Sequence, residues 1–226
     1  MTTTPALLKP TERPCVLREK DHKYIYMPTG QRMKTSVTGI IKNGKEFYEN
    51  PKANIQRDIG IHTHAWLNAW CNGKAENFRM ECPQGHDCTP WIKALEADES
   101  LTSSEILATE FTMVDCDRGF GGQLDILIRT TDEKTLLVDL KTKTKNWKSP
   151  SKKDKYEYKC QAGGYLDLFW TGTDAGNARQ IKVDECQTLI VKPWEAVWLD
   201  PYQVETCSKH WRECWETYAD TALTEF

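Results

Sequence analysis

The sequence of 226 residues contains no long hydrophobic run, and this absence limits the classes of protein to consider. No stretch approaches the roughly 20 apolar residues that a membrane-spanning helix needs. Residues 1–15 lack the apolar core of a secretory signal peptide and the arginine-rich composition of an organelle import signal. Together with a mean hydropathy of -0.65, these features predict a soluble globular protein, which we expect in the cytoplasm of a bacterium or of a phage-infected cell.

The sequence also lacks the closely spaced cysteine pairs that most structural zinc sites use. Its nine cysteines are odd in number and scattered, which favours reduced thiols over a disulfide framework. Cys82 and Cys88 flank His86 and could recruit zinc, but a structural zinc site needs four ligands. Cys71 or Cys116 could supply the fourth only if the fold happened to bring it close, so a zinc-binding interaction module is one alternative.

A strong excess of one charge is absent as well, because the formal net charge is only -3. Residues 141–159, the basic segment, are the exception, with eight lysines against two acids. The remaining chain holds 22 basic and 31 acidic residues, so a basic strip lies on an acidic body. Lysines that neutralise phosphates beside aromatic rings that stack bases are typical of single-strand binding. The predicted DNA-binding residues are Lys143, Lys145, Trp147, Lys148, Lys152, Lys153, Lys155, Tyr156 and Tyr158; the alternative is a solvated lysine-rich loop.

Length and a hydrophobic content of 39% predict one domain, residues 23–226, preceded by a flexible segment, residues 1–22. Strand-like and helix-like hydrophobic periods are mixed along the chain, which predicts an α/β fold. The hydroxyl groups of residues 36–38 are placed to cap a helix, and the last predicted helix has a core-like face. The expected strands are 23–27, 106–114, 123–130, 135–142 and 186–192, and the expected helices are 51–71, 91–98, 158–170 and 201–218.

Two of these strands carry acids where a buried sheet would have apolar residues. Residues 136–138 are apolar, and Asp139 and Lys141 then share one face of the strand because side chains alternate. Asp125 is a further acid in a strand that otherwise suits a core. Two carboxylates beside a lysine are what a hard divalent cation and an attacking water need. A salt-bridged sheet edge is the alternative that these residues leave open.

Four short motifs follow one another in the chain. They are Gly60-x-x-x-His64, Gly122-x-x-Asp125, Asp139-Leu140-Lys141-Thr142 and Gln161-x-x-x-Tyr165. In this order they resemble the RecB-type branch of the PD-(D/E)XK nuclease superfamily. Residues 36–38 and the tryptophan-rich final helix are similar to phage exonucleases and to the mitochondrial genome maintenance exonuclease. The resemblance implies an α/β, restriction-endonuclease-like core with a central mixed β-sheet flanked by helices.

The resemblance also implies a metal site. His64, Asp125 and Asp139 would be ligands of Mg²⁺ or Mn²⁺, with the Leu140 carbonyl as a possible further ligand. Glu110 is placed like an additional acid of some relatives. Mg²⁺ takes oxygen ligands, while a histidine ligand favours Mn²⁺ slightly.

Catalysis is assigned by the same resemblance. Asp125 and Asp139 would serve the reaction with Lys141, which would orient the attacking water, and Gln161 and Tyr165 would position the site and the DNA backbone. The expected activity is a metal-dependent DNA exonuclease that prefers single strands or ends, with the basic segment forming a loop over the site. The alternatives are a structure-specific or flap endonuclease and a non-catalytic DNA-binding protein. The iron–sulfur cluster of some relatives is not expected, because the available cysteines lack its tight spacing; they are Cys160, Cys186, Cys207 and Cys214.

Overall fold

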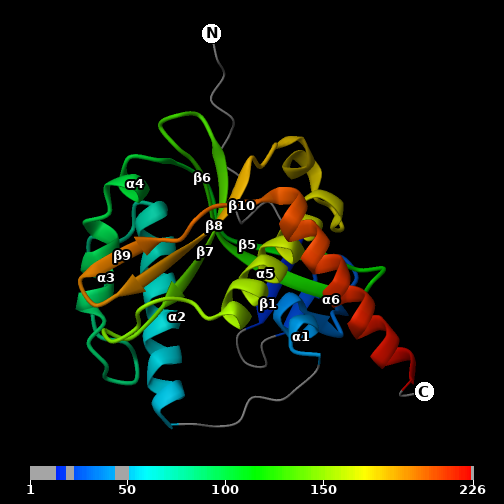
Figure 1. The fold of residues 1–226 in the computed structure, drawn as a ribbon, viewed down its shortest axis with the longest axis horizontal. Coiled ribbons are helices and arrows are strands. Elements are labelled where there is room, and N and C mark those ends of the chain that lie inside the picture. Colours follow the sequence, from blue (N-terminus) through cyan, green and yellow to red (C-terminus); the bar gives the residue numbers. More distant parts are fainter. Residues whose placement is uncertain (1–13, 19–22, 44–50, 225–226) are drawn as a thin grey trace.

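A seven-stranded mixed β-sheet runs through the centre of the protein (Figure 1). The computed structural model describes residues 14–18, 23–43 and 51–224. The path of the sheet is β10-β8-β7-β6-β4, with β5 paired to β6 and β9 paired to β8. Its strands are β4 (Thr35–Ser36), β5 (Glu105–Asp115), β6 (Phe120–Arg129), β7 (Thr135–Thr142), β8 (Glu185–Lys192), β9 (Glu195–Trp198) and β10 (Tyr202–Gln203). The predicted central mixed sheet is therefore confirmed.

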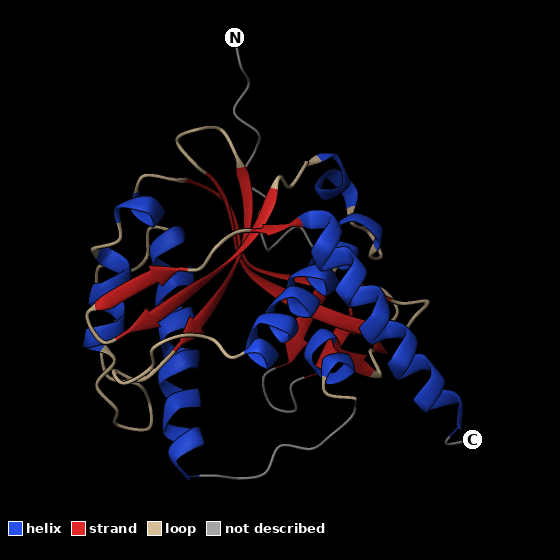
Figure 2. Cartoon of the chain, viewed as in Figure 1, coloured by secondary structure: helices blue, strands red, loops and turns tan. Residues whose placement is uncertain are grey.

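Helices cover both faces of this sheet (Figure 2). On one side, the core gathers residues of α1, α5 and α6, such as Leu166, Phe169 and Trp211. On the other side, it gathers residues of α2, α3 and α4, such as Trp66 and Leu95. The helices are α1 (Val37–Ile41), α2 (Pro51–Cys71), α3 (Thr89–Glu96), α4 (Glu99–Thr102), α5 (Lys152–Thr171) and α6 (Val204–Thr224), with a 3-10 turn at Gly176–Gln180. This two-sided burial explains why β7 and β8 are apolar on both faces.

One edge of β6 is shared by two different strands. Strand β5 pairs with β6 along the whole of one edge. The opposite edge of β6 is divided between β7 and β4. The β7 strand pairs antiparallel with β6 only up to the Ile126–Val138 pair. The β4 strand pairs in parallel with Phe120 and Gly121. The part of β6 that includes Asp125 therefore lies in a fork between its two partners.

The expected helix cap near the start of the domain is confirmed. Ser36 accepts a hydrogen bond from the backbone N–H of Gly39 at 3.1 Å and caps α1.

The glycines of β6 allow close packing against core side chains. A Cβ added to Gly121 would come within 2.5 Å of the Tyr24 ring, and one on Gly122 within 3.0 Å of Leu168.

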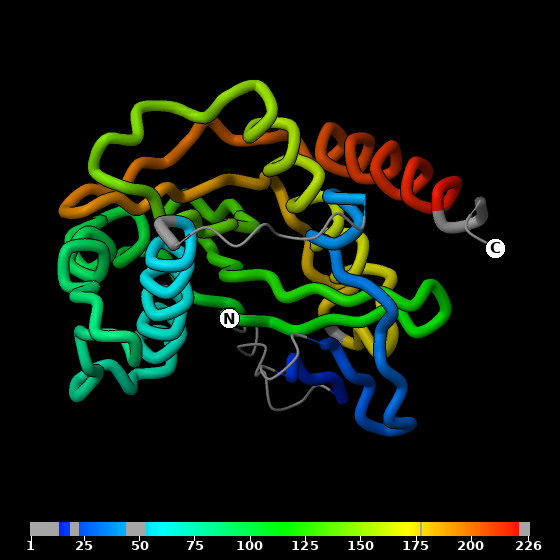
Figure 3. The backbone as a smooth tube through the Cα atoms, turned by 90° about the horizontal axis from the view of Figure 1, so that it is seen from below, coloured from blue at the N-terminus to red at the C-terminus, as the bar shows by residue number. Residues whose placement is uncertain are grey.

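The segment expected to be flexible is partly structured. Cys15–Arg18 forms β1, which pairs antiparallel with β2 (Lys23–Tyr26), and β2 pairs with β3 (Gln31–Arg32). Cys15 and Tyr24 pack against Val114 of β5 in a small core of their own. In Figure 3 the blue β1–β3 segment and the red α6 lie on opposite sides of the green strands. Residues 1–13 and 19–22 lie outside the described residues.

Helix α5 begins six residues earlier than predicted. Ser151 and Asp154 form a capping box, in which each side chain bonds the backbone N–H of the other. This S-x-x-D pattern is a known helix start, and it extends the helix over a stretch that was expected to be loop. Lys152, Lys153 and Lys155 thus lie on α5, and the loop that follows β7 is shorter than expected.

Among the described helices, none combines the length and the apolar content needed to cross a bilayer.

Candidate active site

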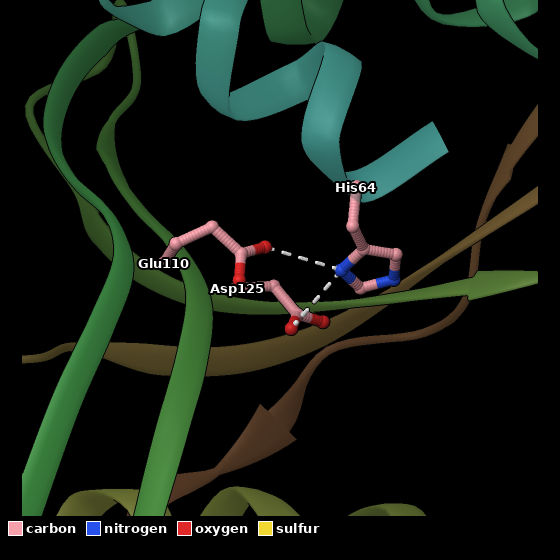
Figure 4. A group of neighbouring side chains, drawn as sticks. All are labelled: His64, Glu110 and Asp125. Atoms are coloured by element: carbon pink, nitrogen blue, oxygen red, sulfur yellow. Dashed lines mark hydrogen bonds and ion pairs between the residues drawn. The ribbon is translucent and has the colours of Figure 1, made fainter. Parts of the chain in front are cut away.

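Three metal-competent side chains meet at the fork in the sheet. His64 of α2 points its Nδ1 atom at Glu110 of β5 and at Asp125 of β6, as Figure 4 shows. The distances from Nδ1 are 3.3 Å to Glu110 Oε1 and 3.4 Å to Asp125 Oδ1. One ligand atom from each residue lies within 4.8 Å of the others, and in the described part of the chain no other such group of three occurs. This grouping can hold a cation with two oxygens and one nitrogen.

Glu110 reaches the cluster through an unusual backbone conformation. Its φ is 44°, in the left-handed region, although it lies inside a long strand. Thr109 pairs with Ile126 and Phe111 pairs with Leu124, so Glu110 lies opposite Asp125 where the ladder is interrupted. Non-glycine residues held in this region cost roughly 1–3 kcal/mol and concentrate at functional sites. The strain supports a functional reason for bringing the two carboxylates together.

Asp125 also bonds the neighbouring strand. Its Oδ2 accepts a hydrogen bond of 2.7 Å from the backbone N–H of Leu140. At this point β7 has already separated from β6, so the N–H would otherwise have no ladder partner on that side. The Leu140 backbone is thus next to the acidic cluster, as the sequence motif suggested.

A second set of side chains forms a row along β7 and α5. Lys141 Nζ lies 2.8 Å from each carboxylate oxygen of Asp139. The same nitrogen donates to Gln161 Oε1 at 3.0 Å, and Gln161 Nε2 donates to the Tyr165 hydroxyl at 2.7 Å. One connected network therefore joins Asp139, Lys141, Gln161 and Tyr165. The helical spacing of four residues brings Gln161 and Tyr165 to the same face.

Burial and charge move the pKa values of the two aspartates in opposite directions. Burial raises the pKa of Asp139 to about 6, against the opposing effect of Lys141. Burial also acts on Asp125, but the charges of His64 and Lys141 and the Leu140 N–H bring its pKa below the usual value. Burial lowers the pKa of His64, whereas Asp125 and Glu110 raise it. The two acids outweigh burial, so the pKa of His64 is raised above its usual value. The two acids therefore favour the protonated form of His64, and a divalent cation would compete with that proton.

The residues present fit a divalent cation. Apart from Lys141, no group in the described chain donates a hydrogen bond to the buried Oδ2 of Asp139. Asp139 is not in the group of three, but the charges of Asp125 and His64 act on its pKa, so its carboxylate lies within electrostatic range of the cluster. Oxygen-rich sites of this kind suit Mg²⁺ and Mn²⁺.

The salt-bridged sheet edge does not describe this site. Strand β7 has β6 on one side and β8 on the other up to Val138, and its Asp139–Lys141 part lies in the fork, paired with β8. Asp139 is 1% exposed. A buried ion pair in the middle of a sheet is costly to desolvate, so stability alone does not explain it.

The two histidines of α2 have different environments. His64 faces the acids, whereas His62 Nε2 bonds the Arg79 carbonyl at 2.7 Å and its ring packs on Phe78. Sequence reasoning missed Tyr24, whose pKa is raised by burial and then by the charges of Asp125 and Glu110. Tyr24 is therefore within electrostatic range of the cluster. It lies on β2, in a different sheet, so no sequence spacing could reveal this.

A pocket of about 200 Å³ opens beside Lys141. Its lining comes from the end of α1 and the first half of α5, with Thr38, Lys42, Glu157 and Gln161 among the residues. The pocket gives space for a substrate group next to the Lys141–Gln161 pair.

The predicted DNA-binding residues have different environments. Lys145, Lys148, Lys152, Lys153 and Lys155 are exposed, and Lys143 and Trp147 are partly exposed.

One of the two predicted tyrosines, Tyr158, requires correction. Tyr158 is only 5% exposed, so its ring has no free face for a base. Tyr156 is 40% exposed on α5, with its ring 5.1 Å from that of His210 on α6, so it remains a candidate for stacking on a base.

The loop that follows β7 is held to the sheet at its start. The backbone N–H of Lys143 donates to the Val191 carbonyl, and the Lys143 carbonyl accepts a hydrogen bond from the Trp91 side chain. The part of the predicted loop from Lys152 onward is helix.

The cysteine-based metal sites are not supported in the described residues. Cys82, His86 and Cys88 do not form a metal-competent group of three. For the iron–sulfur cluster, Cys207 and Cys214 are seven residues apart on α6, about 10 Å along the helix axis. They belong to separate pairs, Cys186 with Cys207 and Cys160 with Cys214.

The forked mixed sheet presents several acids and a lysine at one place. These groups form a site of the type that metal-dependent phosphodiesterases use. The sequence model of the PD-(D/E)XK nuclease superfamily matches residues 44–223. The chain therefore belongs to this superfamily, whose nucleases use divalent metal ions.

Two solved structures are similar to the chain. One is a protein of Eubacterium rectale described provisionally as an exonuclease, with 11% identity and a TM-score of 0.47, covering 80% of this chain and 77% of its own. The other is named SSO0001, with 14% identity and a TM-score of 0.36, covering 80% and 74%. No curated protein sequence matches the chain.

Proposed function

We propose that this nuclease is a metal-dependent DNA exonuclease that acts on single strands or DNA ends. The observation that carries the nuclease chemistry is the meeting of His64, Glu110 and Asp125 beside the Asp139–Lys141 pair. The preference for a chain end is supported by the basic segment, whose exposed lysines follow the catalytic strand directly.

In the proposed mechanism, Asp125, Asp139, Glu110 and His64 would hold Mg²⁺ or Mn²⁺, with the Leu140 carbonyl as a further candidate ligand. When bound, the metal lowers the pKa of a water and stabilises negative charge on the phosphate. His64 would have to be neutral to act as a ligand, so metal binding would depend on pH.

Lys141 orients the attacking water and stabilises charge on the phosphate. Its ammonium group is fixed by Asp139 on one side and by Gln161 on the other. Burial disfavours this charge, but Asp139 and Asp125 outweigh burial and raise the pKa of Lys141. Lys141 thus stays a cation and acts through its charge and N–H groups. Tyr165 fixes Gln161 in turn, because its hydroxyl accepts from the amide.

DNA binding is proposed for Lys143, Lys145, Lys148, Lys152, Lys153 and Lys155, with Trp147 and Tyr156 as the base-stacking rings. Lysines on the loop and on the first turn of α5 can contact successive phosphates. Tyr156, which is 40% exposed, stays in this set, whereas Tyr158 is left out because its ring is buried.

Digestion of end-labelled linear and circular DNA tests this function. The substrates are single- and double-stranded, each incubated with Mg²⁺ or Mn²⁺. We expect linear single strands to be degraded and circular single strands to be spared. Efficient cutting of circles would replace the exonuclease with the endonuclease alternative and leave the metal site unchanged. Binding without cleavage of any substrate would favour a non-catalytic DNA-binding protein.

A further inference from the structure

Two thiols from neighbouring helices lie in direct contact away from the acidic cluster. Cys214 of α6 donates its thiol hydrogen to the sulfur of Cys160 on α5, and the two sulfur atoms are 2.9 Å apart. The sulfurs of a disulfide are about 2.0 Å apart, so bond formation needs a closing of about 0.9 Å. We propose that Cys160 and Cys214 form a reversible thiol–disulfide site, oxidised by low-molecular-weight disulfides of the glutathione type.

The two cysteines are suited to different parts of this reaction. Cys214 is partly exposed and can be reached by a small disulfide, whereas Cys160 is buried. The hydrogen bond with Cys160 lowers the pKa of Cys214 to about 7, helped by Tyr156 and opposed by burial and by Glu213 and Glu157. The same bond and burial raise the pKa of Cys160. Cys214 is therefore the attacking thiolate and Cys160 the resolving thiol.

The exchange proceeds in two balanced steps. The Cys214 thiolate attacks one sulfur of the small disulfide and forms a mixed disulfide, while the other sulfur leaves as a thiolate. Cys160 then loses its thiol proton to solvent and attacks Cys214 Sγ, which expels the second small thiolate. The protein loses two electrons and two protons, and the small disulfide is reduced to two thiols. Excess dithiothreitol reverses both steps.

Neighbouring groups argue for thiol chemistry here and against a metal. His210 is close to the pair in sequence and in space, but its Nδ1 bonds the Thr206 carbonyl at 2.8 Å. Cys160, His210 and Cys214 do not form a metal-competent group of three within the described chain. The other contacting pair, Cys186 with Cys207, is buried on both sides and offers no entry for an oxidant.

The bond would cross-link two helices that pack closely. A Cβ added to Gly163 of α5 would come within 2.2 Å of the Cys207 carbonyl of α6. The two helix backbones are therefore in close contact at this point. Cys160 also directly precedes Gln161, which bonds Lys141. Oxidation therefore ties the catalytic helix to α6 at its active-site end. A disulfide that closes a chain segment this long also restricts the unfolded state.

The test uses the reduced full-length protein incubated with oxidised glutathione. We expect an intact mass lower by two hydrogens and, in a non-reducing digest, a peptide pair joined through Cys160 and Cys214. Dithiothreitol should restore the mass, and the oxidised protein should have a higher Tm. An unchanged wild-type protein, a disulfide between other cysteines, or an unresolved glutathione adduct would each overturn the proposal. This peptide map needs no variant, so it stands even if a substitution impairs folding.

Two variants separate the roles of the sulfurs. Cys160→Ser should hold a stable glutathione adduct at Cys214, because the resolving thiol is gone. Cys214→Ser should gain neither an adduct at Cys160 nor the disulfide. Cys116→Ser is the matched control, since Cys116 is also partly exposed, and it should form the disulfide like the wild type. Equal adduct formation by both single variants would contradict the assigned order of attack.

Discussion

Asp125 accepts a hydrogen bond from the backbone N–H of Leu140 at 2.7 Å, so a candidate metal ligand also holds the neighbouring strand in place. The bond occurs just beyond the last β6–β7 pair, Ile126 with Val138. The carboxylate thereby replaces a ladder partner that the fork removes. Asp125 Oδ2 accepts the hydrogen bond from β7, and Asp125 Oδ1 faces His64. The same carboxylate therefore contributes to the fold and to the site.

The first prediction compares two replacements of Asp125. Asp125→Ala leaves the buried Leu140 N–H without its acceptor, which costs about 1–3 kcal/mol. Asp125→Asn keeps an acceptor oxygen and should be the more stable of the two, although both should lose activity. Urea unfolding of the metal-free proteins measures the difference. Equal stability of the two variants would mean that the Leu140 bond contributes nothing to the fold.

The second prediction concerns the Lys141–Asp139 pair. Lys141→Ala or Asp139→Asn should reduce DNA cleavage by at least about 100-fold, because each removes charge directed at the reacting phosphate or its metal. DNA binding and secondary structure should change little. Lys134→Ala is the control, since Lys134 precedes the same strand but pairs with Glu185 at its far end. A folded Lys141→Ala or Asp139→Asn enzyme that cuts at the wild-type rate would rule out the catalytic assignment.

The third prediction separates the histidines of α2. His64→Ala should weaken Mn²⁺ and Mg²⁺ binding and raise the metal concentration needed for cleavage, because it removes a candidate ligand of the acidic cluster. His62→Ala should leave both unchanged, as its ring bonds a carbonyl elsewhere. Calorimetric titration of each variant with Mn²⁺ gives the comparison independently of activity. Similar, small effects for both would reduce His64 to a structural role.

Local motifs predicted the strands and the residue pairs that depend on a single element. The alternation of β7 placed Asp139 and Lys141 on one face, and the helical spacing in α5 placed Gln161 above Tyr165. These relationships need only the regular geometry of a strand or a helix. The internal position of β7 was not predictable, because strand order depends on pairing between distant segments.

Glu110 shows the limit of sequence reasoning most clearly. Its carboxylate reaches Asp125 through a positive φ, a conformation that glutamate seldom adopts and that no local pattern signals. The start of α5 is a different case. Ser151 and Asp154 form a capping pattern that the sequence does contain, but the preceding proline and serines favoured a loop there.

The fourth prediction concerns the basic segment. Replacing its exposed lysines by alanine should weaken DNA binding and flatten its salt dependence. Each lost phosphate contact lowers the log–log slope by up to about 0.7–0.9. The variant combines Lys148→Ala, Lys152→Ala, Lys153→Ala and Lys155→Ala. Lys153 should contribute least, because it already lies 3.7 Å from Glu157.

The control for this experiment is Lys74→Ala with Lys182→Ala, two lysines outside the basic segment. Fluorescence anisotropy with labelled single-stranded DNA over a range of salt concentrations measures the slope. If the slope of the four-lysine variant matches that of the wild type and the control, the basic segment is a solvated stretch.

The last prediction concerns a carboxylate that joins three parts of the fold. Asp167 of α5 accepts hydrogen bonds from Arg118 at 2.6 Å and from Trp211 at 2.8 Å. Burial opposes the charge of Asp167, but these bonds and that of Thr171 lower its pKa. Asp167→Asn should reduce stability by about 2 kcal/mol at neutral pH, because Arg118 loses a partly buried partner.

The pH dependence of this loss has a definite sign. A carboxylate whose pKa is lower in the folded state stabilises the fold above its unfolded value of about 3.9. The difference between the wild type and Asp167→Asn should therefore be constant near neutral pH and shrink as the pH falls through the folded pKa. Urea unfolding at several pH values measures it, with the exposed Asp117→Asn as the control. A difference that persists undiminished in strong acid would show that Asp167 acts through packing, because its charge would then be gone.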